Sequence, residues 1–364
     1  MSTENIHKHQ DSMVENLPPN APTANLQTVD LERLIEQSED EVNKLLRASV
    51  LDGFFYLDLR SISAKNGILE HVNDIFTLEE ELFGLDNSEK LKYDVDKTGG
   101  KFGKMKLSGY KPMGRNFGGI GGKSDGFESY SIPKDGILNL EGAGDFVRPP
   151  PIDAHKESLE KFIAFVQHAS QAIYKALSSA LCLDPSEAFE NFHRPNMQSP
   201  DLLRLLKYHP QPITERGAPQ TPHTDLGSLT FLFTRQNGLQ VLPRGAQDWL
   251  YVACKPGHAV INLGDGMSLL SNGLLQSCLH RVAPLPSEAF KTRYSFAYLQ
   301  RAEDDTIMRG LKSPVIPKSD PQAQSHTSAE WLVKKFGMLR GATYSKEESW
   351  VLTGVKPQQL ITTQ

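Results

Sequence analysis

His223 and Asp225, separated by one residue, form the first pattern in this sequence that could do chemistry. Side chains at positions i and i+2 of a strand point to the same face of a sheet, so this pair can offer an imidazole and a carboxylate to one metal ion. His280, on a later predicted strand, can supply a third ligand. Two imidazoles and one carboxylate suit a divalent iron that keeps open positions for substrate and O₂. Zinc accepts the same ligand set, so the pattern also allows a zinc hydrolase.

Arg293 and Ser295 repeat this spacing on the last predicted strand. A guanidinium binds a carboxylate through two parallel hydrogen bonds, and a neighbouring hydroxyl can add a third. Burying an arginine inside a barrel is costly unless an anion compensates its charge. The pair therefore predicts either a bound carboxylate or an internal salt bridge to an Asp or Glu.

Short strands after residue 200 must position these side chains. They are expected over residues 202–208, 228–233, 238–242, 249–252, 259–262, 277–282 and 293–298. Gly, Pro, Asn and Asp separate them, and many short strands at such spacing favour a sandwich, a jelly roll or a barrel. Upstream we expect short strands over 26–30 and 53–57, and helices over 30–36, 38–49, 68–91 and 152–183.

Residues 98–125 form a glycine-rich stretch with interleaved lysines and arginines. Long loops of this kind inside a globular chain are commonly functional, so we expect this one to border the active site. A phosphate cradle around Gly121–Ser124 is disfavoured, because no predicted strand precedes it and no helix follows it. The basic side chains of the loop either favour an anionic substrate or are solvated; they are Lys101, Lys104, Lys106, Lys111 and Arg115.

The overall composition is that of an ordinary globular protein, with 364 residues, 38% hydrophobic residues, a net charge of −5 and a pI of about 6.1. This balance argues against a nucleic acid or an anionic membrane as partner, and no run of 18 apolar residues could span a bilayer. Three scattered cysteines fit neither a disulfide framework nor a zinc site, which favours a reduced intracellular protein. No targeting signal is visible, so the expected location is the cytoplasm. The oligomeric state cannot be read from the sequence.

Several motifs taken together resemble the iron(II)- and 2-oxoglutarate-dependent dioxygenases of the isopenicillin N synthase-like class, of the fungal type. The motifs, in chain order, are Asp52-Gly-Phe-Phe-Tyr56, His223-Thr-Asp225, Asn262-Leu-Gly-Asp265, His280-Arg-Val282 and Arg293-Tyr-Ser295. Their order and spacing match the family over roughly residues 26 to 300. The resemblance implies an α+β chain whose core is a distorted double-stranded β-helix, or jelly roll, with flanking helices.

The same resemblance implies a division of the chain and a set of site residues. The segments are a disordered tail (1–25), the dioxygenase N-terminal region (26–150), a helical support (151–200), the jelly-roll core (201–300) and a helical C-terminal extension (301–364). His223, Asp225 and His280 match the iron ligands of the family, with no catalytic residue beyond them. The cosubstrate residues that match are Arg293, Ser295 and Tyr208. Leu206 stands where many relatives carry an asparagine. Aromatic residues that could line the substrate pocket are Tyr110, Phe127 and Phe233.

The implied reaction uses Fe(II), with 2-oxoglutarate and O₂ as cosubstrates. The 2-oxo acid is oxidised to succinate and CO₂ while a small organic substrate is hydroxylated, desaturated or cyclised. Fungal relatives commonly act in secondary-metabolite biosynthesis, which we expect here too. Two alternatives remain from the sequence: an oxidase that uses Fe(II) and O₂ without 2-oxoglutarate, and a non-catalytic jelly-roll binding module. Intact residues at all three metal positions argue against the second.

Overall fold

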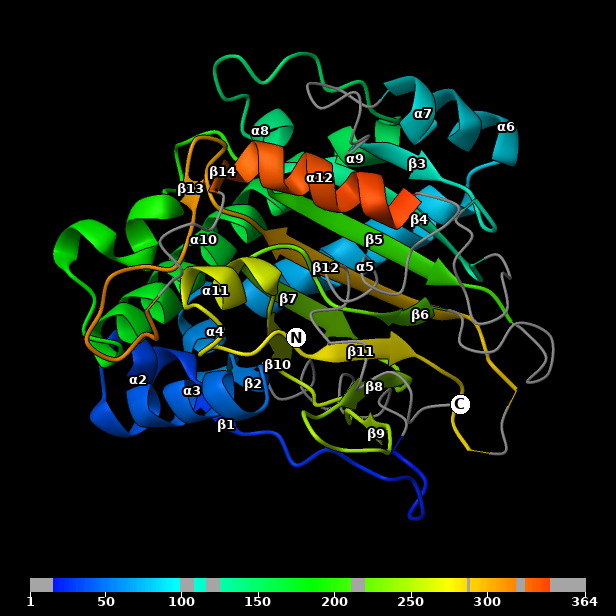
Figure 1. Ribbon diagram of the computed structural model, residues 1–364. Coiled ribbons are helices and arrows are strands. Elements are labelled where there is room, and N and C mark those ends of the chain that lie inside the picture. The colour runs from blue at the N-terminus through cyan, green and yellow to red at the C-terminus, as the bar shows by residue number, and fades with distance from the viewer. Residues whose placement is uncertain are drawn as a thin grey trace.

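The structure of this chain is a computed structural model that describes residues 16–98, 108–115, 125–210, 220–286, 289–318 and 325–340. Two β-sheets lie at its centre, with helices packed around them (Figure 1). The eight-stranded sheet has the order β1-β2-β10-β7-β12-β5-β4-β3. Its strands, in that order, are Thr28–Asp30, Phe54–Asp58, His258–Leu263, Leu229–Thr234, Arg293–Gln300, Leu202–Tyr208, Phe127–Pro133 and Gly109–Lys111.

A second, four-stranded sheet has the order β6-β11-β8-β9. These strands are Gln220–His223, Leu279–Val282, Leu239–Leu242 and Leu250–Tyr251. A short hairpin of β13 (Ile307–Met308) and β14 (His326–Thr327) stands apart. From β5 onward the chain passes repeatedly between the two sheets, as in a double-stranded β-helix: β5, β7, β10 and β12 belong to the larger sheet, and β6, β8, β9 and β11 to the smaller one. The α+β jelly roll expected from the sequence is confirmed.

Most of the helices pack on the outer face of the large sheet, but the last described helix, Ser328–Arg340, lies on the opposite face, where Leu332 packs against Leu202, Ala297 and Leu299 (Figure 1). The longer helices are α3 (Glu39–Leu51), α5 (Ile68–Gly84), α10 (Lys156–Ala180) and α12 (Ser328–Arg340). The short ones are α2 (Leu31–Ile35), α4 (Arg60–Asn66), α6 (Asn87–Lys90), α7 (Val95–Thr98), α8 (Lys134–Ile137), α9 (Pro150–Ala154) and α11 (Asp265–Leu270). Short turns of 3₁₀ helix in the described residues are Leu91–Tyr93, Pro185–Glu187 and Phe189–Phe192.

The strands of the large sheet alternate strictly between two environments, as the two-residue period requires. Phe233 and Phe296 stack at 5.0 Å on the helical face, where Phe162 of α10 packs against both. Their neighbours Thr234 and Ser295 belong to the opposite face, which looks into the space between the sheets. The helical face therefore builds the main core, and the inner face is left for polar chemistry.

Helix α2 begins at a side-chain cap. Asp30 accepts a hydrogen bond from the N–H of Arg33 at 3.0 Å and starts α2. The helical stretch expected over 68–91 is interrupted at Leu85, whose extended backbone separates α5 from α6. The stretch expected over 152–183 breaks at His155 into α9 and α10.

The strand ranges expected from the sequence did not include β3, β4, β6, β13 and β14. The large sheet draws β1 to β4 from residues before 134, so it crosses the segment boundaries that the sequence suggested. The expected tail also differs over its described part. Thr23 bridges to Tyr251, and the N–H of Ala24 donates to the carbonyl of Tyr251 at 2.9 Å, because that edge of β9 is open to pairing. Residues 1–15, 99–107 and 116–124 lie outside the described residues, and so do the Gly121–Ser124 motif and much of the glycine-rich stretch.

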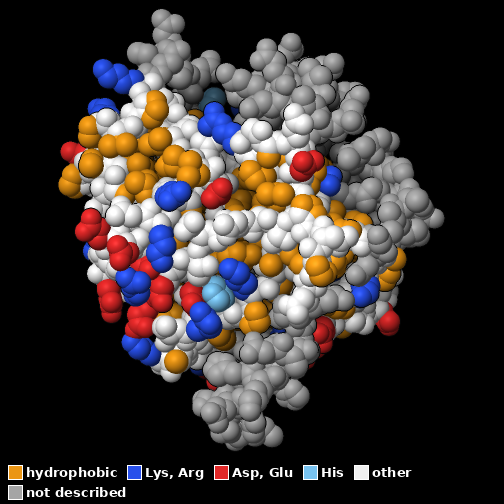
Figure 2. All heavy atoms as spheres, turned by 90° about the horizontal axis from the view of Figure 1, so that it is seen from below, with side chains coloured by type: hydrophobic (Ala, Val, Ile, Leu, Met, Phe, Trp, Pro, Cys, Tyr) orange, Lys and Arg blue, Asp and Glu red, His pale blue; other side chains and the backbone are white. Residues whose placement is uncertain are grey.

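The surface seen in Figure 2 mixes acidic and basic side chains rather than separating them. The described part of this face therefore carries no field of one sign of the kind that attracts phosphate backbones. No helix in the described part of the chain is long and apolar enough to cross a membrane.

Candidate metal centre

Strands β6 and β11 bring the three predicted metal-binding side chains together. His280 is the register partner of His223 across this antiparallel pair, and their ring centroids lie 4.3 Å apart. Asp225 lies two residues after the end of β6, and its Oδ1 lies 3.8 Å from Nε2 of His223 and 3.9 Å from Nε2 of His280. One ligand atom from each residue lies within 4.8 Å of the others. This spacing is suited to a single small cation held by two imidazoles and one carboxylate.

The two oxygens of Asp225 have different surroundings. Oδ1 faces the two imidazoles, while Oδ2 accepts hydrogen bonds from Thr230 Oγ1 at 2.6 Å and from Asn262 Nδ2 at 2.8 Å. Burial alone would raise the pKa of Asp225, but His280, His223 and these two donors outweigh it and lower the pKa to about 2. The carboxylate is therefore ionised and oriented before any metal binds.

The ring of His280 is also fixed from behind. Its Nδ1 lies 3.2 Å from the carbonyl oxygen of Cys278, which can only accept, so Nδ1 carries the proton and Nε2 is left as the lone-pair donor. Phe54 of β2 packs edge-on against this ring at 5.4 Å. The Asp52-Gly-Phe-Phe-Tyr56 motif thus contributes Phe54 to the site directly.

The turn that carries Asp225 rests on a backbone contact with room only for glycine. The N–H of Asp265 donates to the carbonyl of Asp225 at 2.8 Å, and that of Gly266 donates to the carbonyl of Gly227 at 2.9 Å. A Cβ at Gly264 would lie 2.2 Å from the Gly227 oxygen and 2.8 Å from the Asp225 oxygen. The Asn-Leu-Gly-Asp motif therefore has a physical meaning: Asn262 holds the carboxylate, and Gly264 lets the turn come close.

Arg293 and Ser295 lie on the inner face of β12, where the sequence placed them. Arg293 is 2% exposed. Its Nη1 donates to Ser295 Oγ at 2.9 Å and its Nε reaches the carbonyl of Gln236 at 3.4 Å, but Nη2 has no hydrogen-bond partner among the described residues. A buried donor left open in this way is costly unless a ligand completes it. It fits a carboxylate better than the internal salt bridge considered above.

Tyr208 connects this arginine to the metal cluster. The guanidinium of Arg293 lies 5.2 Å above the Tyr208 ring. The hydroxyl of Tyr208 donates to Oε1 of Gln220 at 2.6 Å, and Nε2 of Gln220 lies 3.2 Å from Nε2 of His223. Sequence reasoning did not single out Gln220, because residues three apart on a regular strand point to opposite faces, and the register shift in the β6–β11 pair has no local signal.

A fully buried acid, Glu79, lies close to strands β5 and β12. Oε1 of Glu79, on α5, accepts a hydrogen bond from the N–H of Leu206 at 2.9 Å, and Leu206 is the register partner of Ser295. Burial raises the pKa of Glu79 to about 8, against the opposing effects of the Leu206 N–H and of Arg293. Glu79, like Gln220, was not foreseen.

The structure places the three aromatic residues suggested for the substrate pocket in different surroundings. Phe127 packs against Tyr208 at 5.4 Å and shares a cluster with Val282 and Phe290 beside the site. Phe233 does not line the pocket, because the strand period turns it to the helical face, against Phe162. Tyr110 is also turned away, with its hydroxyl donating to Glu128 Oε2 at 2.7 Å.

The described basic residues of the glycine-rich stretch are matched by acids. Lys111 lies 2.6 Å from Asp125, and burial lowers its pKa to about 8 against the effect of that carboxylate. Arg115 pairs with Asp94 at 2.7 Å and also with Asp96. These charges are structural ion pairs rather than solvated groups.

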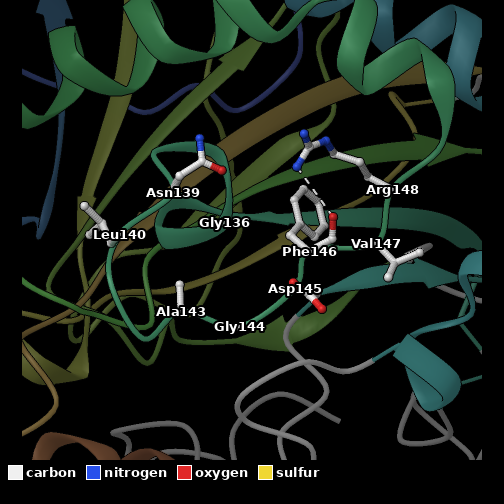
Figure 3. Close-up of a pocket in the computed structure, with 9 residues that line it drawn as sticks. All are labelled: Gly136, Asn139, Leu140, Ala143, Gly144, Asp145, Phe146, Val147 and Arg148. Atoms are coloured by element: carbon white, nitrogen blue, oxygen red, sulfur yellow. Dashed lines mark hydrogen bonds between the residues drawn. The ribbon is translucent and has the colours of Figure 1, made fainter.

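A separate cavity of about 380 Å³ is lined by Gly136 of α8 and by residues of the segment that joins α8 to α9 (Figure 3). None of the metal-cluster residues line it. Arg148 at its wall is already engaged, since its Nη1 donates to the carbonyl of Phe146 at 3.5 Å and its Nε pairs with Asp153 at 2.7 Å. The titratable side chains of His223, Asp225 and His280 come together between the two sheets instead, and we place the chemistry there.

A double-stranded β-helix with two imidazoles and a carboxylate between its sheets is the architecture of non-haem iron oxygenases. The sequence profile of the 2OG-Fe(II) oxygenase superfamily matches residues 199–302. The 2-oxoglutarate-dependent dioxygenase frbH of Dothideomycetidae sp. is 32% identical over 335 residues, which cover 90% of this chain and 95% of that protein. The chain belongs to the 2OG-Fe(II) oxygenase superfamily, and it is a dioxygenase that uses Fe(II), 2-oxoglutarate and O₂.

Two further relatives agree with this assignment. The 2-oxoglutarate-dependent dioxygenase iboH of Amanita muscaria is 42% identical over 216 residues, covering 58% of this chain and 99% of that protein. Among solved structures, full-length Neurospora crassa T7H in complex with alpha-KG superimposes with a TM-score of 0.70 at 22% identity, covering 86% of this chain and 95% of that one. The second likeness concerns the fold alone.

Proposed function

We propose that His223, Asp225 and His280 hold the Fe(II) of this dioxygenase. The observation that carries the proposal is the convergence of their three ligand atoms within 4.8 Å. The hydrogen bonds to Asp225 Oδ2 and to His280 Nδ1 support it, because they leave Oδ1 and Nε2 directed at a common point. Bound iron supplies the activation of O₂, coupled to the oxidation of 2-oxoglutarate to succinate and CO₂.

The proposal gives Arg293, Ser295 and Tyr208 the task of binding 2-oxoglutarate. The open Nη2 of Arg293 and the adjacent Ser295 hydroxyl offer donors for the distal carboxylate. Anchoring that end fixes which way the 2-oxo acid end points, so the cosubstrate arrives at the metal in one orientation. Phe127 and Phe290, packed around Tyr208, exclude water from this part of the space.

The substrate in this proposal is a small organic molecule that is hydroxylated, desaturated or ring-closed in secondary-metabolite biosynthesis. The similarity to frbH and iboH over most of their lengths supports a fungal biosynthetic role. A further crystal structure of T7H holds thymine, a small molecule, beside alpha-KG. The cytoplasmic location expected from the sequence is part of the same proposal.

Anaerobic titration with Fe(II) and 2-oxoglutarate tests the assignment. The wild type should show the weak visible metal-to-ligand charge-transfer band of a chelated 2-oxo acid. Arg293→Ala should bind Fe(II) normally but need far more 2-oxoglutarate to develop the band, while the control Arg60→Ala, on α4, should match the wild type. Absence of bound iron in the folded wild type would refute the metal ligands, and an unchanged Arg293→Ala titration would refute the role of Arg293.

A further inference from the structure

Asp265 contacts both the proposed ligand Asp225 and the residue that precedes it. Its side-chain Oδ2 accepts a hydrogen bond from Thr224 Oγ1 at 3.2 Å, and its backbone N–H donates to the carbonyl of Asp225 at 2.8 Å. The same Oδ2 lies 2.8 Å from Nζ of Lys335. Lys335 belongs to α12, more than a hundred residues further along the chain than the ligand. Lys335 is thus connected through Asp265 to Thr224, the residue between His223 and Asp225.

The ion pair between Lys335 and Asp265 is buried. The side chains are 9% and 7% exposed, and Nζ of Lys335 lies 5.4 Å from the centre of the Trp331 ring on the same helix. Removing one partner of a buried pair leaves the other charge desolvated and uncompensated, which is strongly unfavourable. The Asp265 carboxylate would then move toward water or toward another donor, and Thr224 would lose its acceptor.

A second contact from α12 reaches the other neighbour of Asp225. Leu332 is fully buried in a cluster with Leu202 of β5, Ala297 and Leu299 of β12, and Leu226, and Figure 1 shows α12 beside β5. Leu226 follows Asp225 directly. The helix therefore supports the residues on both sides of Asp225, one through Lys335 and Asp265 and one through apolar packing. Val333 and Lys334, on the opposite side of α12, are exposed.

We propose that α12 helps to position the ligands of the iron centre. Lys335 is the positioning residue, and it holds the segment of Asp225 in place through Asp265. The inference rests on the proposed metal ligands. Binding of the metal and docking of α12 then stabilise each other, because each favours the same placement of the 224–226 segment. Residues in direct contact with metal ligands commonly change metal affinity by about 10- to 100-fold. Because Lys335 acts through Asp265, an effect at the lower end of that range is expected.

Metal binding without turnover tests this coupling. Anaerobic equilibrium dialysis with Fe(II), and Mn(II) titration followed by electron paramagnetic resonance, should show about 10-fold weaker binding in Lys335→Met. Lys335→Arg should retain most of the affinity, and Lys334→Met should match the wild type. Hydrogen exchange in the full-length wild type should slow within residues 328–340 when Mn(II) is added, and Lys335→Met should lose that response.

The outcomes separate the two proposals. A folded wild type that binds neither metal contradicts the ligand assignment itself. A wild type that binds, with a folded Lys335→Met variant of equal affinity and an α12 that ignores the metal, overturns the role of Lys335 alone. If Lys335→Met fails to fold, Asp265→Asn replaces it, because the amide keeps an acceptor for one partner and removes the charge. The double variant Lys335→Arg/Asp265→Asn should then bind no more weakly than Asp265→Asn, since both changes act on one contact.

Discussion

Arg293 donates from Nη1 to Oγ of Ser295 at 2.9 Å, two residues along the same strand, while its Nη2 meets no acceptor among the described residues. The arginine is thus held in place before any cosubstrate binds. Because side chains at i and i+2 share a face, the serine can brace the guanidinium and still offer its own hydroxyl proton to a bound carboxylate. This arrangement is what the proposed binding of the distal carboxylate of 2-oxoglutarate requires: a buried guanidinium held in place with one donor open.

Arg293→Lys tests the geometry of this receptor rather than its charge. An ammonium keeps the positive charge but cannot form the two parallel bonds of a guanidinium. We expect the KM for 2-oxoglutarate to rise about 10-fold, which corresponds to ~1.4 kcal/mol, with Fe(II) affinity unchanged. Steady-state kinetics against 2-oxoglutarate would measure this. A lysine variant with the wild-type KM would show that charge alone anchors the cosubstrate.

Thr230→Val removes one of the two donors to Asp225 Oδ2 with little change of volume. The carboxylate keeps Asn262 but gains freedom to rotate, because the shorter of its two hydrogen bonds, at 2.6 Å, is lost. Fe(II) affinity should fall about 10-fold. Equilibrium dialysis measures it, with Thr77→Val on the exposed side of α5 as the matched control. Equal affinities in both variants would contradict the positioning role of Thr230.

The parts of this molecule that could be read from the sequence are those fixed by local rules. The two-residue period placed His223 with Asp225 and Arg293 with Ser295, although Asp225 lies in the turn after β6 and not on the strand itself. It also delimited most strands of the two sheets, because each strand needs one apolar face. The two pairs lie 70 residues apart in the sequence. The spacing of the motifs indicated that they belong to one site, because the family resemblance implies which strands lie side by side.

Long-range packing could not be read in the same way. Phe233 was expected in the pocket, but which face of a strand meets the helices depends on pairing partners far along the chain, here Phe296 and Phe162. Strand β4 was missed because a glycine-rich stretch precedes it. Glu79 and Lys335 lie on helices whose polar residues are mostly solvated, and nothing local distinguishes a buried acid or cation from its exposed neighbour.

Gly264→Ala should disturb both stability and the metal centre. The added Cβ would lie 2.2 Å from the Gly227 oxygen, so the turn carrying Asp225 must shift. Overpacking of this kind costs about 1–3 kcal/mol, and metal affinity should fall with it. Urea denaturation of the metal-free protein gives the first quantity and dialysis gives the second. Gly84→Ala is the control, because a Cβ there meets nothing within 4 Å; it should leave both unchanged or raise stability by ~1 kcal/mol or less.

Glu79 predicts an unusual dependence of stability on pH. Burial raises its pKa in the folded protein from an ordinary value of 4.5 to about 8. Between these values the folded state binds the proton and the unfolded state does not. The unfolding free energy must therefore fall as pH rises through this window. The stabilising contribution is complete below about pH 4.5 and is lost above about pH 8, where the folded protein must hold a buried carboxylate.

Glu79→Gln isolates this contribution, because the amide oxygen can still accept the hydrogen bond from the Leu206 N–H without a titrating proton. Relative to the wild type, the variant should gain stability between pH 5.5 and pH 8.5, by on the order of 3 kcal/mol. Urea denaturation of the metal-free proteins at the two pH values measures the difference. Glu80→Gln, exposed and adjacent on α5, should show no such gain. A wild type and a Glu79→Gln variant that change in parallel with pH would mean that Glu79 is already ionised in the folded protein, with Arg293 as its counter-charge.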